Sequence, residues 1–388
     1  MHPIYMDYAA TTPTDKRVIE AMLPYFGEVY GNPSSLHAFG QEAKAAVEGA
    51  REKIASYLGA DPAEIVFTSG GTESDNFAIK GVAYANRKKG DQIITSAIEH
   101  PAVLETCRFL EREGFRVIYL PVDGEGLVDP AELAAAITDK TILISIMHAN
   151  NEIGTIQPIA EIAALARERG VIFHTDAVQS FGQLPFTADE LHVDLLSATA
   201  HKLYGPKGVG LLYIRKGTRI APFMHGGEQE RGRRSSTLNV PGIVGFGKAV
   251  ELAGASLTGE AARLTNLRDR FISGLFERLD GIRLNGHPTQ RLPNNINFSA
   301  AHVEGEGMIL SLDMLGIACS TGSACSSSSV EKSHVLTAIG LPEEFSHGSL
   351  RITLGRFTKE SDIDAVLETL PQVVGRLRSL SPTHWGRE

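Results

Sequence analysis

The stretch Leu195-Leu196-Ser197-Ala198-Thr199-Ala200-His201-Lys202 is an apolar run that ends in a lysine, shortly before the turn residues Gly205-Pro206. Other short apolar runs precede it, and patterns typical of helices separate them. This alternation is typical of βαβ units, whose parallel strands are buried on both faces. The sequence therefore predicts an α/β fold with a mostly parallel sheet. The expected strands are residues 64–67, 92–97, 116–122, 141–147, 171–176 and 194–199, and the expected helices are 73–87, 130–136, 158–169 and one that follows Pro101.

The character of the chain changes after about Gly254. Longer helical patterns and short, separate strands follow, and they indicate a smaller α+β unit. We therefore expect a large domain over residues 15–254 and a small domain that combines 1–14 with 255–388. The expected elements of the small domain are helices at 259–279 and 360–377 and strands at 295–298 and 350–354.

The composition excludes several classes of protein. Of the 388 residues, 43% are apolar and 21% are charged, close to the average of globular proteins. The net charge of −9, without a run of like charges, argues against a surface for nucleic acid or anionic membranes. The first residues lack the regions of a secretory signal, and no stretch approaches the roughly 18 apolar residues of a membrane span. We therefore expect a soluble cytoplasmic protein.

The chain has three cysteines, Cys107, Cys319 and Cys325. A small odd number in a long chain does not form a disulfide framework, and it indicates a reducing compartment. Cys107 lies on an expected amphipathic helix, where we expect it in the core. Cys319 is expected to be a small buried residue, and its spacing from Cys325 does not match a zinc-binding Cys-x-x-Cys pair.

Two charged residues stand at the ends of expected strands. Lys202 is expected to be partly desolvated there, which favours the neutral, nucleophilic amine of a lysine that forms a Schiff base. Asp176 can keep a pyridinium nitrogen protonated at such a strand end, as pyridoxal 5′-phosphate enzymes require. Each residue alone has an ordinary explanation, because Lys202 can extend to water and Asp176 can cap the next helix.

The stretch Ser69-Gly70-Gly71-Thr72 follows an expected strand and opens an expected helix, which is the arrangement of a phosphate-binding turn. It matches neither the P-loop nor the dinucleotide-binding glycine pattern. His100 ends another strand, where it can stack on a flat ring or move protons. A plain tight turn and a capping or surface histidine are the ordinary alternatives. Together with Lys202 and Asp176, these features favour a pyridoxal 5′-phosphate site.

Longer stretches of the chain, above all Ser320-Thr321-Gly322-Ser323-Ala324-Cys325-Ser326-Ser327, carry a family resemblance. The sequence resembles the group I cysteine desulfurases, a branch of the class V aminotransferases among the fold type I pyridoxal 5′-phosphate enzymes. The resemblance covers nearly the whole chain, and it implies a seven-stranded sheet in the large domain and a homodimer. The other matching stretches are residues 8–13, 31–35, 68–76, 150–154 and 349–358.

The resemblance also implies a role for each matching residue. Lys202 resembles the lysine that binds the cofactor covalently, Asp176 the partner of the ring nitrogen, and Gln179 the partner of the ring hydroxyl. His100 stacks on the ring in such a site and helps with proton transfer. Asn151 and Arg351 are implied to bind the substrate carboxylate, and Asn151 is also implied to contact the cofactor. The residues implied to bind the cofactor phosphate are Gly71, Thr72, Thr199, His201 and, from the neighbouring subunit, Thr237.

Cys325 resembles the nucleophile that takes sulfur from L-cysteine. Serine, glycine and alanine dominate residues 320–329, so we expect a mobile segment whose thiol reaches the active site and then an acceptor. A serine-rich loop with an incidental cysteine is the alternative. The implied reaction gives L-alanine and a persulfide on Cys325, which passes its sulfur to an acceptor protein. In this family the acceptor most often serves iron–sulfur cluster assembly. Through its persulfide, Cys325 is then a transient ligand of the cluster.

Other functions are compatible with parts of this pattern. A related aminotransferase or a selenocysteine lyase would share the fold, although an aminotransferase has no use for Cys325. A sulfur carrier without catalysis would not need Lys202, and a nicotinamide dehydrogenase would need the missing glycine pattern. The acceptor is left open, since tRNA thiolation and nitrogenase maturation use similar enzymes. The sequence departs from the family at three places. Thr199 stands where serine is more common, and Ser236 stands where glycine is common, so an altered backbone is expected there. The stretch after Leu377 is shorter than in many members of the family.

Overall fold

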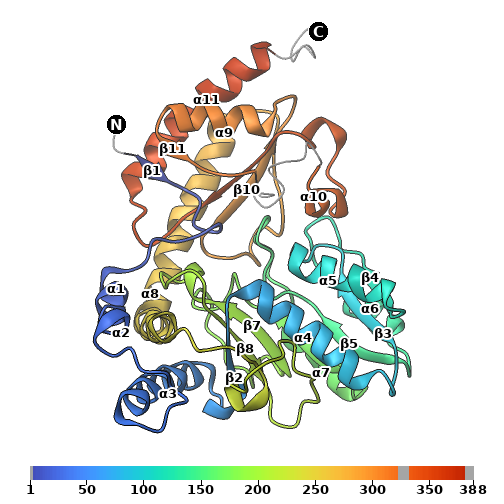
Figure 1. Cartoon of the computed structure of the whole chain (residues 1–388). Coiled ribbons are helices and arrows are strands. Elements are labelled where there is room, and N and C mark those ends of the chain that lie inside the picture. Colours follow the sequence, from blue (N-terminus) through green and yellow to red (C-terminus); the bar gives the residue numbers. More distant parts are fainter. Residues whose placement is uncertain (1–2, 322–331, 381–388) are drawn as a thin grey trace.

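The computed structural model describes residues 3–321 and 332–380 (Figure 1). A seven-stranded sheet has the strand order β2-β8-β7-β6-β5-β3-β4. β8 runs antiparallel to both of its neighbours, and the other neighbouring strands are parallel. The predicted α/β fold with a mostly parallel sheet is therefore confirmed. The strands are β2 (Ile65–Thr68), β3 (Gln92–Ser96), β4 (Arg116–Leu120), β5 (Thr141–Ser145), β6 (Ile172–Asp176), β7 (Leu195–Thr199) and β8 (Gly210–Ile214).

The sheet has a hydrophobic core on each face, because successive side chains of a strand point to opposite faces. Phe67 and Ile94 belong to one core, and their neighbours Val66 and Ile93 belong to the other. Helices bury both faces, as a parallel sheet requires. The first core receives side chains from α1 (Lys16–Met22), α3 (Ala38–Leu58), α6 (Pro130–Ala136), α7 (Ile159–Glu168) and the first part of α8 (Val240–Arg278), and the second from α4 (Gly71–Asn86) and α5 (Pro101–Arg112).

Several elements were not expected from the sequence, among them the 21-residue helix α3 and the strand β8. β8 follows β7 without an intervening α-helix and pairs antiparallel with it, which breaks the expected alternation. α8 is 39 residues long and begins well before the expected residue 259, so the expected boundary near Gly254 lies inside a helix. Glycines early in α8 lower its helix propensity and conceal it in the sequence. Gly247 allows α8 to pack closely against α3, since a Cβ at this position would lie 2.8 Å from Cα of Ala50 in α3.

A second, three-stranded antiparallel sheet has the order β12-β10-β9 and lies beyond the seven-stranded sheet at the upper end of α8 (Figure 1). Its core contains Phe271 of α8 together with Phe298 and Ile352 of the sheet. The N-terminal strand β1 pairs in parallel with β11 beside it. Whether these parts are separate domains with the expected limits stays a prediction. The elements are β1 (Ile4–Tyr5), β9 (Ile282–Leu284), β10 (Asn295–Ala300), β11 (Ile317–Ala318), β12 (Ser349–Thr353), α9 (Gly305–Met314) and α11 (Glu360–Leu380).

Two short helices complete the described chain, α2 (Pro24–Gly27) and α10 (His334–Ala338). None of the helices in residues 3–321 and 332–380 combines the length and the apolar character needed to cross a membrane. The carboxyl ends of β3, β6 and β7 lie at one edge of the large sheet, because these strands and the intervening β5 are parallel. Open parallel sheets bind their ligands at this edge.

Candidate active site

A cavity of about 390 Å³ lies at the carboxyl edge of the large sheet and is also lined by Arg351 of β12. This volume lies in the range of small-molecule sites. The cavity brings together residues that are far apart in the sequence. Ten residues singled out in the sequence line it, and they are Gly71, Thr72, His100, Asn151, Asp176, Gln179, Thr199, His201, Lys202 and Arg351.

Lys202 ends the short 3₁₀ helix η2 (Ala200–Lys202), which follows β7 directly. Its Nζ donates hydrogen bonds to the backbone oxygens of Ala9 and Ala10, and the second measures 2.7 Å. The side chain is half-buried and lines the cavity. Lys202 therefore does not simply extend to water, and its amine is presented to a ligand.

Asp176 ends β6 and is buried. Its Oδ1 accepts a 2.8 Å hydrogen bond from the backbone N–H of Val178, which closes the turn after β6. No helix lies in the described residues between β6 and β7, so the alternative that Asp176 caps the next helix is wrong. Burial raises the pKa of Asp176 to about 6, although the Val178 N–H and the charge of Lys202 act against this. The carboxyl group also lines the cavity, so this turn contact and a ligand-binding role are compatible. A cationic ring nitrogen beside it would lower this pKa again, because an opposite charge favours the carboxylate.

His100 is the N-cap of α5 and lines the cavity at the same time. Its Nδ1 accepts a 3.1 Å hydrogen bond from the N–H of Ala102, so the proton of the neutral ring is on Nε2. Burial, and then the charge of Lys202, lowers the pKa of His100 to about 4. Beside it, Glu99 is fully buried and accepts from the Ser96 hydroxyl at 2.7 Å, and burial raises its pKa to about 8. Near pH 7 His100 is therefore a neutral ring with one N–H donor.

The start of α4 lines the cavity with Gly71 and Thr72 and is suited to bind an anion. Helix N-termini attract anions, because their first N–H groups have no partner within the helix. α4 begins at Gly71, where a Cβ would lie 2.7 Å from Cγ2 of Val178, so the glycine lets the turn after β6 pack against the helix start. The Thr199 hydroxyl donates to the Val209 oxygen at 3.1 Å, and Nδ1 of His201 lies 3.2 Å from the Thr11 hydroxyl.

Arg351 supplies a cation from the smaller sheet. Its guanidinium is buried, with Nη2 2.9 Å from Oδ1 of Asp7 and Nη1 donating to the Asn151 oxygen at 2.9 Å. The planar guanidinium group binds carboxylates with two parallel hydrogen bonds. A ligand carboxylate in the cavity can therefore bind Arg351, in competition with Asp7.

Sequence reasoning missed several residues of the cavity. Ala9 and Ala10 act only through their backbone oxygens, which leave no signal in the side chains. Asp75 lies one helical turn after Thr72, so the helical period could have indicated it. Its Oδ1 has no hydrogen-bond partner in the described part of the chain and lies 3.7 Å from Nε2 of His174. Burial, and then the charge of Asp176, raises the pKa of Asp75. Met147 and Val178 complete the missed set.

Two expected site residues lie elsewhere. Thr237 is exposed and outside the cavity, and its contact across a subunit interface stays a prediction. Ser236 beside it has a φ of 90°, in the region that favours glycine, so the backbone takes a glycine-like conformation despite the side chain. Cys325, with most of the segment expected to be mobile, lies outside the described residues.

The other two cysteines, Cys107 and Cys319, lie within the described residues. Cys107 is fully buried on α5, which confirms its expected place in the core, and burial raises the pKa of its thiol. Cys319 is only partly buried against the core of the smaller sheet, and burial raises its pKa to about 12. No group of three or more His, Cys, Asp or Glu side chains within residues 3–321 and 332–380 could hold a metal ion.

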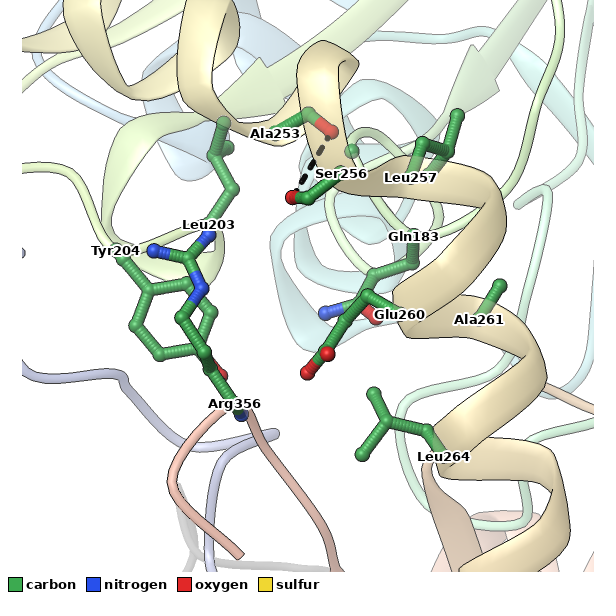
Figure 2. Close-up of a pocket in the computed structure, with 11 residues that line it drawn as sticks. Gln183, Leu203, Tyr204, Ala253, Ser256, Leu257, Glu260, Ala261, Leu264 and Arg356 are labelled. Carbon is green, nitrogen blue, oxygen red and sulfur yellow. Dashed lines mark hydrogen bonds between the residues drawn. The ribbon is translucent and has the colours of Figure 1, made fainter.

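A second hollow lies beside α8 and is bordered by Glu260, Tyr204 and Arg356 (Figure 2). Its volume of about 20 Å³ has room for roughly one water molecule, so it is not a ligand site. Arg356 stacks 4.3 Å above the Tyr204 ring and pairs with Asp15 at 2.6 Å. This junction connects the segment after Lys202 with the residues that follow β12.

A buried histidine behind the cavity gives a first test. His148 is 5% exposed, packs edge-on against Phe186 and donates its backbone N–H to the Asp176 oxygen. Burial lowers its pKa to about 4, from an ordinary value of 6.5. A lowered pKa stabilises the fold fully above pH 6.5, and this contribution is lost as the pH falls toward 4. Replacing His148 by asparagine should therefore destabilise the cofactor-free protein by about 2 kcal/mol less at pH 5 than at pH 8.

The measurement is urea unfolding of both proteins at the two pH values. Phe186→Leu serves as control, because it removes packing from the same ring pair without removing a titrating group. Its destabilisation should be the same at both pH values. An equal effect of His148→Asn at pH 5 and pH 8 would contradict a neutral, buried imidazole.

Comparison with known proteins gives a consistent result. A family model described as aminotransferase class-V matches residues 4–366. A cysteine desulfurase IscS of Dictyoglomus turgidum is 59% identical over 379 residues, which are 98% of this chain and 96% of that protein. A solved NifS-like protein is 42% identical with a TM-score of 0.91, covering 97% of this chain and all of its own. SspA, solved in complex with cysteine, is 41% identical with a TM-score of 0.82, covering 92% of this chain and 100% of its own.

Proposed function

This chain belongs to the class V aminotransferase family, and from that membership we propose that it is a cysteine desulfurase, which removes sulfur from L-cysteine and releases L-alanine. The observation that carries the proposal is the single cavity lined by Lys202, Asp176, His100 and Arg351. It offers an amine, a buried carboxyl group, a neutral ring and a carboxylate-binding guanidinium to one small molecule. The relatives named cysteine desulfurases match along nearly the full chain, which supports the same activity here.

Pyridoxal 5′-phosphate is the cofactor that this set of groups fits. The amine of Lys202 suits its carbonyl carbon, the carboxyl group of Asp176 suits its ring nitrogen, and the start of α4 suits its phosphate. The neutral ring of His100 and the amide of Gln179 remain for the ring face and the ring hydroxyl. When bound, this cofactor supplies an electron sink that weakens the bonds around the substrate Cα.

Residues of the chain itself bind the substrate and transfer protons. Arg351, with Asn151, orients the carboxylate of L-cysteine at the cavity. Lys202 removes the proton from the substrate Cα once its amine is released, and Asp176 holds the proton of the ring nitrogen. His100 donates or accepts a proton through Nε2 beside the substrate.

Cys325 supplies the nucleophile for the sulfur step. Its thiolate attacks the substrate sulfur, so a sulfur–sulfur bond forms while the carbon–sulfur bond of L-cysteine breaks. The electron pair stays with carbon, which takes up a proton and leaves as the methyl group of L-alanine. The balance is one thiol and one cysteine in, one persulfide and one alanine out, and no oxidant is needed.

The proposal includes a homodimer and a sulfur acceptor. Large apolar side chains are exposed close together in the sequence at Leu23, Phe26, Tyr30 and Leu36, which is typical of surfaces that another chain covers. The exposed Thr237 would then reach the cavity of the second subunit. We propose an iron–sulfur scaffold protein as the acceptor and the cytoplasm as the compartment, because Cys325 must stay a free thiol.

The direct test is the product analysis of the protein loaded with pyridoxal 5′-phosphate. With L-cysteine and dithiothreitol, it should release alanine and sulfide in equal amounts. Transfer of an amino group to a keto acid without sulfide would identify an aminotransferase instead. Turnover of selenocysteine with no turnover of cysteine would identify a selenocysteine lyase, and a purified protein that binds no cofactor would indicate a carrier.

A further inference from the structure

Helix α10 follows the cysteine segment in the chain, and its apolar side packs on residues around the large sheet. In Figure 1 it lies beside the turquoise part of the chain near α5. Its apolar side chains form a separate small cluster with residues that follow β3 and β5, and each member of this cluster is at most 4% exposed. The members are Val335, Leu336 and Ile339 on the one side and Ile98, Met147 and Ile153 on the other.

Two side-chain hydrogen bonds complete this contact. The Ser333 hydroxyl donates to Oε2 of Glu152 at 2.6 Å, and it also caps α10 by accepting from the N–H of Leu336. Nε2 of His334 donates to the backbone oxygen of Glu99 at 2.9 Å. Glu152 and Glu99 are both buried, so the acceptor atoms of these two hydrogen bonds are shielded from solvent. We call Ser333, His334 and α10 the downstream anchor.

The downstream anchor binds residues that adjoin the active site. Glu99 precedes His100, and Glu152 follows Asn151, while Met147 belongs both to the apolar cluster and to the cavity lining. The anchor therefore packs directly behind the wall of the cavity. A displacement of α10 would therefore act on the cysteine segment on one side and on the cavity wall at Met147 on the other.

The upstream end of the cysteine segment is also attached to a cavity residue. The backbone of Ser320 pairs with the backbone of Arg351 through hydrogen bonds of 2.6 and 3.2 Å. Cys325 follows Ser320 by five residues and precedes Ser333 by eight, and an extended chain spans at most about 3.6 Å per residue. Both attachments limit how far the thiol can be from the cavity.

We propose that Ser333 and His334 are positioning residues for sulfur transfer, because they fix the downstream end of the cysteine segment to the cavity wall and so direct Cys325 toward the substrate sulfur. This inference rests on the proposed function. Restricting the thiol to the neighbourhood of the cavity raises its effective concentration there. Loss of either hydrogen bond should slow the transfer of sulfur, while Arg351 and the groups that bind the cofactor stay in place.

The experiment compares Ser333→Ala and His334→Ala with the conservative variants Ser333→Thr and His334→Gln, which keep a donor at the same place. Lys332→Ala is the matched control, since Lys332 is closer to Cys325 but forms an exposed ion pair with Glu343. Single-turnover formation of alanine and of the persulfide gives the rate of transfer. The change of cofactor absorbance on titration with L-alanine, the product, gives binding, and thermal unfolding gives stability.

We expect the two alanine variants to transfer sulfur on the order of 10- to 100-fold more slowly, with binding of L-alanine changed less than about twofold. The conservative variants and Lys332→Ala should stay close to the wild type. Unchanged transfer in both alanine variants, or an equal loss of binding and transfer, would overturn the inference. Neither result would affect the proposed function, which is tested separately by the products formed from L-cysteine.

Discussion

Replacing Cys325 by alanine is expected to lower the formation of alanine and sulfide from L-cysteine by on the order of 10³-fold, while the cofactor stays bound. The physical reason is that only a thiolate combines high nucleophilicity toward sulfur with a substantial population near neutral pH. No neighbouring cysteine can replace it. Cys107 is fully buried, and burial raises the pKa of Cys319 to about 12, so both thiols stay protonated.

The measurement is the yield of alanine and sulfide, together with the amount of ³⁵S that stays on the protein after desalting. Cys319→Ala is the matched control, because it removes the nearest described thiol and should keep both activity and bound label. Absorbance of the cofactor and its change with L-alanine should be the same in wild type and Cys325→Ala. An active Cys325→Ala protein, or an inactive Cys319→Ala protein with the cofactor bound, would contradict the assignment.

Much of the fold could be predicted because local patterns agree with the final structure. The eight expected strands are all present, and α6 has the predicted limits, since its Asp129 cap and Pro130 mark the start in the sequence. β8 and the start of α8 could not be predicted from local patterns. β8 breaks the strand–helix alternation, and the glycines of α8 are explained only by the close contact with α3.

The site residues that could be predicted from the sequence are those that stand at the ends of predicted strands. His100 has the local capping role that its sequence context indicates, whereas Asp176 closes a turn and caps no helix. Both side chains also line the cavity. For His100 the two interpretations were not exclusive, because a cap at a strand end uses one atom of the side chain and leaves the rest to the cavity. The backbone oxygens of Ala9 and Ala10 could not be found, since the contact joins segments almost 200 residues apart.

Lys202 is expected to be as important as Cys325, and for a different reason. Its amine is the only atom of the chain proposed both to bind the cofactor covalently and to remove a proton from the substrate. Both tasks need a neutral amine during part of the cycle, and the half-buried setting beside the carbonyls of Ala9 and Ala10 holds it in place for them. Arginine is the stringent replacement, because a guanidinium keeps a positive charge and its donors but does not lose its proton in proteins.

Lys202→Arg and Lys202→Ala should therefore both lose turnover of L-cysteine by on the order of 10³-fold, even where the cofactor is bound non-covalently. Treatment with borohydride followed by peptide mass analysis should find the cofactor on Lys202 in the wild type and on no residue in either variant. Lys207→Ala, an exposed lysine of the same turn, should behave as the wild type. If Lys202→Arg kept its activity, charge alone would be sufficient at this position, and the covalent role of the lysine would have to be abandoned. If Lys202→Ala regained activity with added methylamine and Lys202→Arg did not, the need for a neutral amine at this strand end would be established independently of the lysine charge.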